Sequence, residues 1–161
     1  DDDTGIYFRP EVGNNVLIGS VDPVCDPREF VDPDDYDTRL SDEQWEAQVL
    51  RANRRFPSLG VPHEKKGVVD LYDVSDDWLP IYDRTDLDGF YVAIGTSGNQ
   101  YKNAGVAGHL MAELITAVEA GHDHDASPLV TTGHYTGLEL DIGFYSRNRE
   151  INADSSMSVH G

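Results

Sequence analysis

An apolar segment at residues 90–94 (FYVAI) leads into a glycine turn and then into a helical pattern, and this succession constrains the fold most strongly. The segment has the length of a strand, and its continuous apolar character favours burial on both faces. The turn is Gly95-Thr96-Ser97-Gly98. From about residue 104 to 120, apolar residues recur at helical spacing, and Gly121 suits a C-terminal cap. The sequence therefore predicts a strand, a tight turn and a helix.

Other segments predict a mixed architecture. Residues 5–9 and 15–20 have the pattern of two strands joined by turn residues, which indicates a hairpin. Ser41 and Gln44 form a capping-box pattern, so we expect a helix that begins at Ser41 and stops at Pro57. A further strand is expected at about 66–73, and no clear element is predicted after residue 122. The fold class that follows is α+β, with an antiparallel sheet.

The charge of the chain excludes several partners. Thirty acidic residues and twelve basic residues give a formal net charge of −18. Nucleic acid and anionic membrane surfaces are poor partners because both require clustered Lys and Arg. A halophilic source would explain this surface, and an acidic protein from an ordinary cell is the alternative.

Several patterns that the sequence lacks bear on the cellular compartment and on cofactor binding. It has no run of 18 apolar residues and no leader-like N-terminal pattern, and its single cysteine, Cys25, excludes an intrachain disulfide. We therefore expect a cytoplasmic protein. No G-x-G-x-x-G or P-loop pattern occurs, so the chain has no dinucleotide-binding unit of its own.

The turn at residues 95–98 is the best candidate site. Gly95 and Gly98 can take positive φ values and let the backbone approach a ligand. The N–H groups at the start of the following helix favour an anion or an electron-rich oxygen. Lys102 adds a positive charge in a chain with only two other lysines. The alternative is a simple strand–helix turn capped by Ser97 or Asn99.

Three segments resemble the D-amino-acid oxidase superfamily of flavoproteins. GTSGNQYKNAGVAGHLMAELI is similar to the last flavin-contacting segment of the sarcosine oxidase, dimethylglycine dehydrogenase and glycine oxidase branch, with matches at Gly95, Ser97, Gly98, Tyr101 and Lys102. GIYFRPEVGNNVLIGSVDP resembles the substrate-domain hairpin of these proteins. VVDLYDVSDDWLPIYDR resembles the segment between the two. The matches follow the family order over about residues 5–150.

The resemblance implies a C-terminal part of an FAD-dependent oxidoreductase. Residues 1–89 would belong to the substrate-binding domain, and residues 90–161 would hold the last strand and helix of the FAD-binding domain and a tail. The expected partners are an amine or amino-acid substrate and an N-terminal FAD-domain segment that this chain lacks. The implied reaction oxidises the C–N bond of an amino acid or N-methylated amine by hydride transfer to flavin, and the chain alone would be inactive.

The resemblance also assigns residue roles. The flavin contacts would come from Gly95, Thr96, Ser97, Gly98, Asn99, Gln100, Tyr101 and Lys102. Lys102 would hold a substrate carboxylate, Tyr72 would line the substrate cavity, and Arg9 is the third substrate-site candidate. The cysteine that bonds flavin covalently in some members has no match near Tyr72, where Asp70 and Leu71 stand. FAD would therefore be non-covalent.

Two departures and two rival functions remain open. Asn99 and the segment Asn103-Ala104-Gly105 differ from the residues frequent in the family, which leaves the particular substrate undetermined. One rival is a stand-alone acidic binding or interaction domain without redox activity, and another is a family member that acts on glycerol 3-phosphate. Residues 122–125 (HDHD) contain alternating possible metal ligands, but a solvated loop is the simpler interpretation.

Overall fold

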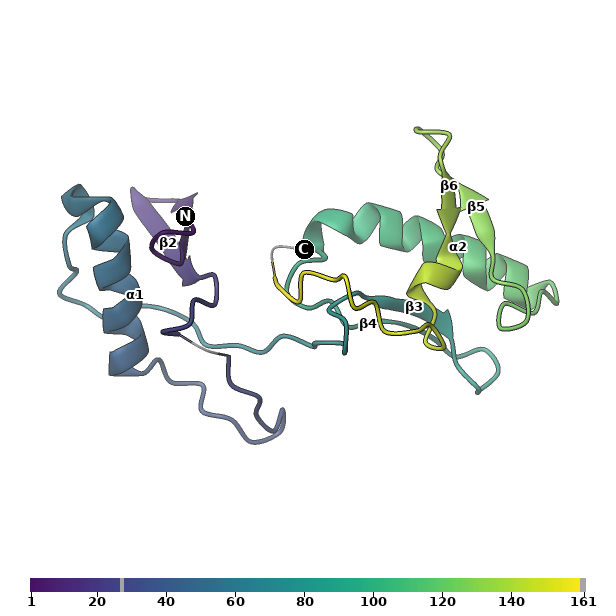
Figure 1. Ribbon diagram of the computed structural model, residues 1–161, viewed down its shortest axis with the longest axis horizontal. Coiled ribbons are helices and arrows are strands. Elements are labelled where there is room, and N and C mark those ends of the chain that lie inside the picture. The colour runs from purple at the N-terminus through teal and green to yellow at the C-terminus, as the bar shows by residue number, and fades with distance from the viewer. Residues whose placement is uncertain (27, 160–161) are drawn as a thin grey trace. The chain divides into compact units, whose positions relative to one another are not determined.

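The computed structural model describes residues 1–26 and 28–159, and the chain forms two compact units (Figure 1). Unit 1 comprises Asp1–Leu71, and unit 2 begins at Tyr72. Both units combine helices with short antiparallel strands, which confirms the α+β class. Residues 72–89 thus lie in one unit with residues 90–94, whereas the resemblance assigned them to the substrate-binding domain. The functional division at 89/90 stays a prediction.

Unit 1 contains the expected hairpin. Strand β1 (Ile6–Glu11) pairs antiparallel with β2 (Asn15–Ser20), from Ile6 opposite Ser20 to Glu11 opposite Asn15. The connection turns at Gly13 and Asn14, which have φ values of 77° and 60°. Gly tolerates this left-handed region without cost, and Asn enters it more readily than most residues.

Helix α1 (Asp42–Arg55) packs on this hairpin. The Ser41 hydroxyl accepts a hydrogen bond from Gln44 N at 3.2 Å, which confirms the predicted cap. Arg51 links the elements, because Nη2 donates to Asp26 Oδ2 at 2.6 Å and Nη1 donates to Gly5 O at 3.2 Å. A short 3-10 turn, η1 (Pro57–Leu59), follows the predicted stop.

The strand expected at residues 66–73 is absent, and that prediction is wrong. The segment is irregular, and Val68 is 88% exposed. A strand requires a neighbour to satisfy its peptide groups, and no strand of the described residues pairs with this segment.

Unit 2 contains the predicted strand–turn–helix. Strand β3 (Ile81–Arg84) pairs antiparallel with β4 (Tyr91–Ile94), and helix α2 (Ala104–Glu119) follows a 3-10 turn, η2 (Tyr101–Asn103). Strand β5 (Val130–Thr132) pairs with β6 (Glu139–Asp141), and η3 (Ile142–Tyr145) follows.

The core of unit 2 lies under α2. Leu110 and Leu114 of α2 pack with Tyr82 of β3 and Ile142 of η3. Gly121 ends the helix with φ 93°, and His122 N donates to Ala117 O at 3.0 Å, so the predicted glycine cap is confirmed. The predicted burial of residues 90–94 on both faces is wrong: β4 has one neighbouring strand among the described residues, and Ile94 is 49% exposed.

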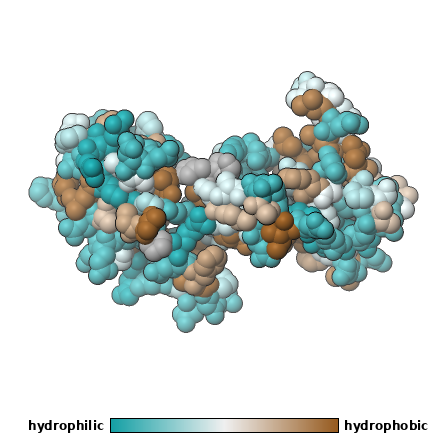
Figure 2. All heavy atoms as spheres, in the orientation of Figure 1, coloured by the Kyte–Doolittle hydropathy of each residue, from teal (hydrophilic) through white to brown (hydrophobic). Residues whose placement is uncertain are grey.

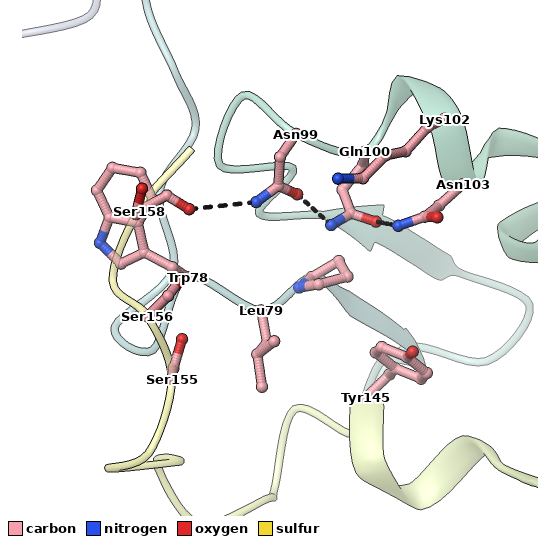
Figure 3. A pocket seen from close by; sticks show the side chains of 11 residues that line it. Trp78, Leu79, Asn99, Gln100, Lys102, Asn103, Tyr145, Ser155, Ser156 and Ser158 are labelled. Carbon is pink, nitrogen blue, oxygen red and sulfur yellow. Dashed lines mark hydrogen bonds between the residues drawn. The ribbon is translucent and has the colours of Figure 1, made fainter. Parts of the chain in front are cut away.

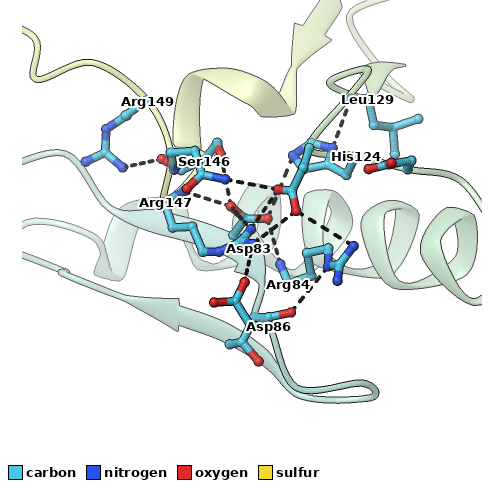
Figure 4. A network of polar contacts seen from close by, with 12 residues as sticks. Asp83, Arg84, Asp86, His124, Leu129, Ser146, Arg147 and Arg149 are labelled. Atoms are coloured by element: carbon cyan, nitrogen blue, oxygen red, sulfur yellow. Dashed lines mark hydrogen bonds and ion pairs between the residues drawn. The ribbon is translucent and has the colours of Figure 1, made fainter.

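A buried carboxylate joins β3 to the C-terminal part of unit 2 (Figure 4). Asp83 is fully buried, and its Oδ2 accepts hydrogen bonds from Ser146 Oγ at 3.0 Å and from Arg147 N at 2.7 Å. Arg147 Nη1 also donates to Asp83 at 3.2 Å and to Asp125 at 2.8 Å. Burying a carboxylate is costly unless donors surround it, and these donors meet that requirement.

Hydrophilic residues cover most of the visible face of each unit, with hydrophobic residues in scattered groups (Figure 2). Neither α1 nor α2, nor any other helix in the described ranges, has the length and apolarity needed to cross a bilayer.

Candidate functional site

Asp73 holds the turn between β4 and α2 from one side. Its Oδ2 accepts a hydrogen bond from Gly95 N at 2.8 Å, its Oδ1 accepts from the Thr96 hydroxyl, and its carbonyl accepts from Ser97 N at 3.1 Å. Partial burial opposes ionisation of Asp73, but these hydrogen bonds outweigh it and lower the pKa of the carboxyl. The turn is therefore fixed by an anion at neutral pH.

Tyr72 packs on the same turn. A Cβ atom at Gly98 would lie 2.6 Å from Tyr72 Cε1, so the ring occupies the space that a side chain at residue 98 would need. Gly98 has φ 75°, a conformation that favours glycine. The structure thus brings together Tyr72, which the resemblance assigned to the substrate cavity, and Gly98, which it assigned to the flavin contacts.

A shallow cavity of about 290 Å³ lies beside the turn (Figure 3). Asn99, Gln100 and Lys102 line one wall, and Trp78 and Leu79 line another. Gln100 Oε1 accepts hydrogen bonds from Asn103 Nδ2 at 3.0 Å and from Tyr82 Oη at 3.2 Å. The cavity therefore combines amide groups and one ammonium group with an apolar wall.

The start of the helical segment has no side-chain cap. No side chain caps η2 or α2 at its N-terminus. A Cβ atom at Gly105 or Gly108 would meet nothing within 4 Å, so the first turns of α2 leave open space beside the backbone. The 3-10 turn η2 runs directly into α2: Asn103 N donates to Gln100 O at 2.9 Å and Ala104 N donates to Tyr101 O. The partial positive charge of the joined helical segment therefore lies at the start of η2, beside the residues that line the cavity.

Two residues at the site have unusual backbone conformations. Trp78 has φ 61° and Ser97 has φ 49°. A bulky residue with positive φ is a genuine outlier, and such strain concentrates at ligand-binding sites. Ser97 is fully buried, and its hydroxyl lies 3.3 Å from Gly95 O as a donor.

The other predicted site residues are placed differently. Tyr101 is 98% exposed. Arg9 lies in unit 1, where its guanidinium pairs with Glu11 at 2.5 Å and its side chain is 65% exposed. The role of Arg9 stays a prediction.

The segment at residues 122–125 is a loop, as expected, and Asp123 and Asp125 are exposed, but it is not solvated throughout. His124 is fully buried, and its Nδ1 accepts a hydrogen bond from Leu129 N at 3.0 Å. His122 Nε2 lies 2.8 Å from Ser127 O. No group of three or more potential metal ligands comes together in the part of the chain that the structure describes.

Sequence reasoning missed Asp73 and the pair formed by Asp77 and Arg149. Neither aspartate stood out, because the chain contains many aspartates and Asp77 lies in an Asp-Asp pair of the kind expected by chance. Asp77 is fully buried and accepts from Arg149 Nη2 at 2.6 Å, across 72 residues of sequence. The one local signal was the position of Asp73, directly after the predicted cavity residue Tyr72.

Comparison with known proteins gives one family. A family model described as FAD dependent oxidoreductase matches residues 1–114. No curated protein and no solved structure matches the chain. The matched range includes the β1–β2 hairpin, Asp73, the turn at residues 95–98 and most of α2.

Proposed function

We propose, from the premise that this chain belongs to the FAD dependent oxidoreductase family, that it forms the flavin-ring end of the active site in an enzyme that oxidises the C–N bond of an amino acid or N-methylated amine. FAD, when bound, supplies the acceptor for the hydride that leaves the substrate carbon. The chain supplies orientation and charge.

One observation carries the proposal: Asp73 holds the turn, and Asn99, Gln100 and Lys102, which follow the turn, line the cavity with amide and ammonium donors. The ring system of a flavin carries carbonyl oxygens along one edge, and donors of this kind suit them. Negative charge collects at that edge on reduction, so positively polarised N–H groups favour the reduced state. We assign flavin contacts to residues 95–102, with FAD held non-covalently.

Lys102 is the proposed carboxylate ligand. It is exposed at the cavity wall, and an ammonium group attracts the carboxylate of an amino acid or N-methylglycine. Tyr72, which packs on Gly98, is proposed to line the substrate side. A carboxylate-bearing amine is favoured over glycerol 3-phosphate because Lys102 is the one basic residue that lines this cavity in the described ranges.

A second polypeptide segment is proposed to complete the FAD site. The sequence has no G-x-G-x-x-G motif, which supplies the pyrophosphate and ribose contacts in dinucleotide-binding domains. Strand β4 pairs on one edge only in the described structure, and an open edge is a template for a further strand. We expect the isolated chain to bind FAD weakly or not at all, and submicromolar binding in a fluorescence titration would contradict this division of the site.

The test of the assignment is the Lys102→Met variant, produced in the source organism and purified from it as the whole enzyme. Its steady-state kcat and KM are measured with sarcosine, dimethylglycine and glycine. A charge-assisted contact contributes roughly 1.5–3 kcal/mol, so we expect kcat/KM to fall about tenfold to a hundredfold, mainly through KM. Lys66→Met is the matched control, since Lys66 pairs with Glu64 in unit 1. Unchanged kcat/KM for all three substrates in Lys102→Met would exclude Lys102 from the site.

A further inference from the structure

Part of the segment at residues 150–158 lines the cavity (Figure 3). Ser155, Ser156 and Ser158 line it together with Trp78 and Asn99. Asn99 Nδ2 donates a hydrogen bond to Ser158 O at 3.4 Å. The backbone carbonyl of Ser158 therefore occupies a donor of the turn that a ligand carbonyl would otherwise use.

The base of this segment is held by a buried ion pair. Arg149 Nε and Nη2 donate to the two carboxylate oxygens of Asp77 at 3.0 and 2.6 Å, and Nη2 also donates to Leu79 O at 2.9 Å. Asn152 N donates to Asp77 Oδ2 at 3.3 Å. A two-pronged Arg–carboxylate contact is strong and directional, so it fixes where the segment leaves the body of unit 2.

The segment connects two parts of unit 2. Short, charge-assisted hydrogen bonds fix its base at Arg149, and near its other end Asn99 donates to Ser158 O at 3.4 Å. Within the segment, Ser155 N donates to Asn152 O at 3.1 Å, and Met157 has φ 50°. The segment thus runs as a strap from the ion pair to the residue that follows the turn.

We propose that residues 150–158 are a strap that closes the cavity, that the Asp77–Arg149 pair is its clasp, and that a ligand displaces Ser158 O from Asn99 on entry. The identity of the ligand rests on the proposed function, but closure of the cavity does not. Asp77 and Arg149 are positioning residues, because they act on the cavity through the strap.

Trp78 reports on closure. It lines the cavity and is 6% exposed, and the sequence contains one other tryptophan, Trp45 of unit 1. In a Trp45→Phe background, all tryptophan fluorescence comes from Trp78. Acrylamide is the suitable quencher because it is small and neutral, so the net charge of −18 does not repel it.

The main variant ends at Asn152, which removes most of the strap and keeps the clasp. Because removal of a cover gives solvent access to a side chain that was protected, we expect the quenching constant to rise about threefold or more. Arg149→Lys keeps the charge but loses the planar fork, so it should give a smaller rise. Asp37→Asn breaks an exposed Asp–Arg pair in unit 1 and should leave quenching unchanged.

Circular dichroism of each variant checks that unit 2 stays folded. An unchanged quenching constant in the folded truncated chain would overturn the strap, and a rise there without any rise in Arg149→Lys would remove the clasp. Neither result depends on flavin binding, so failure of this inference is distinguishable from failure of the proposed function. The kinetic test on Lys102 is equally independent of the strap.

Discussion

Tyr72 lies with its ring against Gly98, and a Cβ atom at Gly98 would come within 2.6 Å of Tyr72 Cε1. The contact joins the first residue of unit 2 to the turn that precedes α2. It makes the glycine necessary for two separate reasons, the positive φ and the lack of space.

Gly98→Ala is expected to destabilise unit 2 by more than Gly89→Ala. Both glycines have positive φ, 75° and 73°, but a Cβ atom at Gly89 would meet nothing within 4 Å. The control thus measures backbone strain alone, about 1 kcal/mol, and Gly98→Ala adds roughly 1–3 kcal/mol for displacement of the Tyr72 ring. Urea unfolding of both variants gives the comparison. Equal losses would mean that the ring moves away without cost.

Asp73→Asn is expected to loosen the turn. The variant keeps the size of the side chain, but its NH₂ group cannot accept a hydrogen bond as the second carboxylate oxygen does from Thr96 or Gly95. We expect a loss of about 1–2 kcal/mol in the free energy of unfolding. The neighbouring exposed Asp76→Asn is the control, with an expected change near zero. Similar losses in both variants would contradict the role of Asp73 in holding the turn.

Local signals in the sequence predicted the elements whose contacts join residues close together in the chain. The hairpin, the Ser41 cap and the Gly121 cap depend on residues within a few positions of one another, so they could be identified without a partner. The Asp77–Arg149 pair spans 72 residues, and the burial of His124 depends on packing against distant elements. Contacts of that kind leave no periodic pattern, which is why the strap and the buried histidine could not be predicted.

His124 is expected to make unit 2 less stable as the pH falls below neutrality. Burial lowers the pKa of His124, although the nearby Asp83 and Asp125 carboxylates oppose the shift. The unfolded chain, with an ordinary pKa of about 6.5, therefore takes up the proton first. Stability is complete above about pH 6.5 and is lost as the pH falls towards the lower pKa of the folded state.

His124→Asn tests this origin, because an amide oxygen can replace Nδ1 as acceptor for Leu129 N without titrating. Urea unfolding at several pH values between 7.5 and 5.5 should give a smaller loss for the variant than for the wild type. The same slope in both proteins would assign the pH dependence to other groups.

Salt is expected to stabilise the fold. The excess acidic side chains, which give a net charge of −18, repel one another. The screening length falls from about 30 Å at 0.01 M to about 3 Å at 1 M salt, so salt weakens this repulsion. We expect the melting temperature to rise by about 3 °C or more over that range of NaCl. The double variant Asp2→Asn and Asp3→Asn, at exposed positions, should show a smaller rise. A melting temperature that is flat or falls with NaCl would contradict the repulsion argument.

The central claim is that this chain forms part of a flavin site for amine oxidation, and the visible spectrum tests it most directly. The protein is purified from its native source through an affinity tag on this chain, so that any bound segment and cofactor remain with it. The account predicts the absorption bands of oxidised flavin, and their bleaching when sarcosine, dimethylglycine or glycine is added without oxygen. A preparation without flavin, or a flavin that none of these amines reduces, would contradict it.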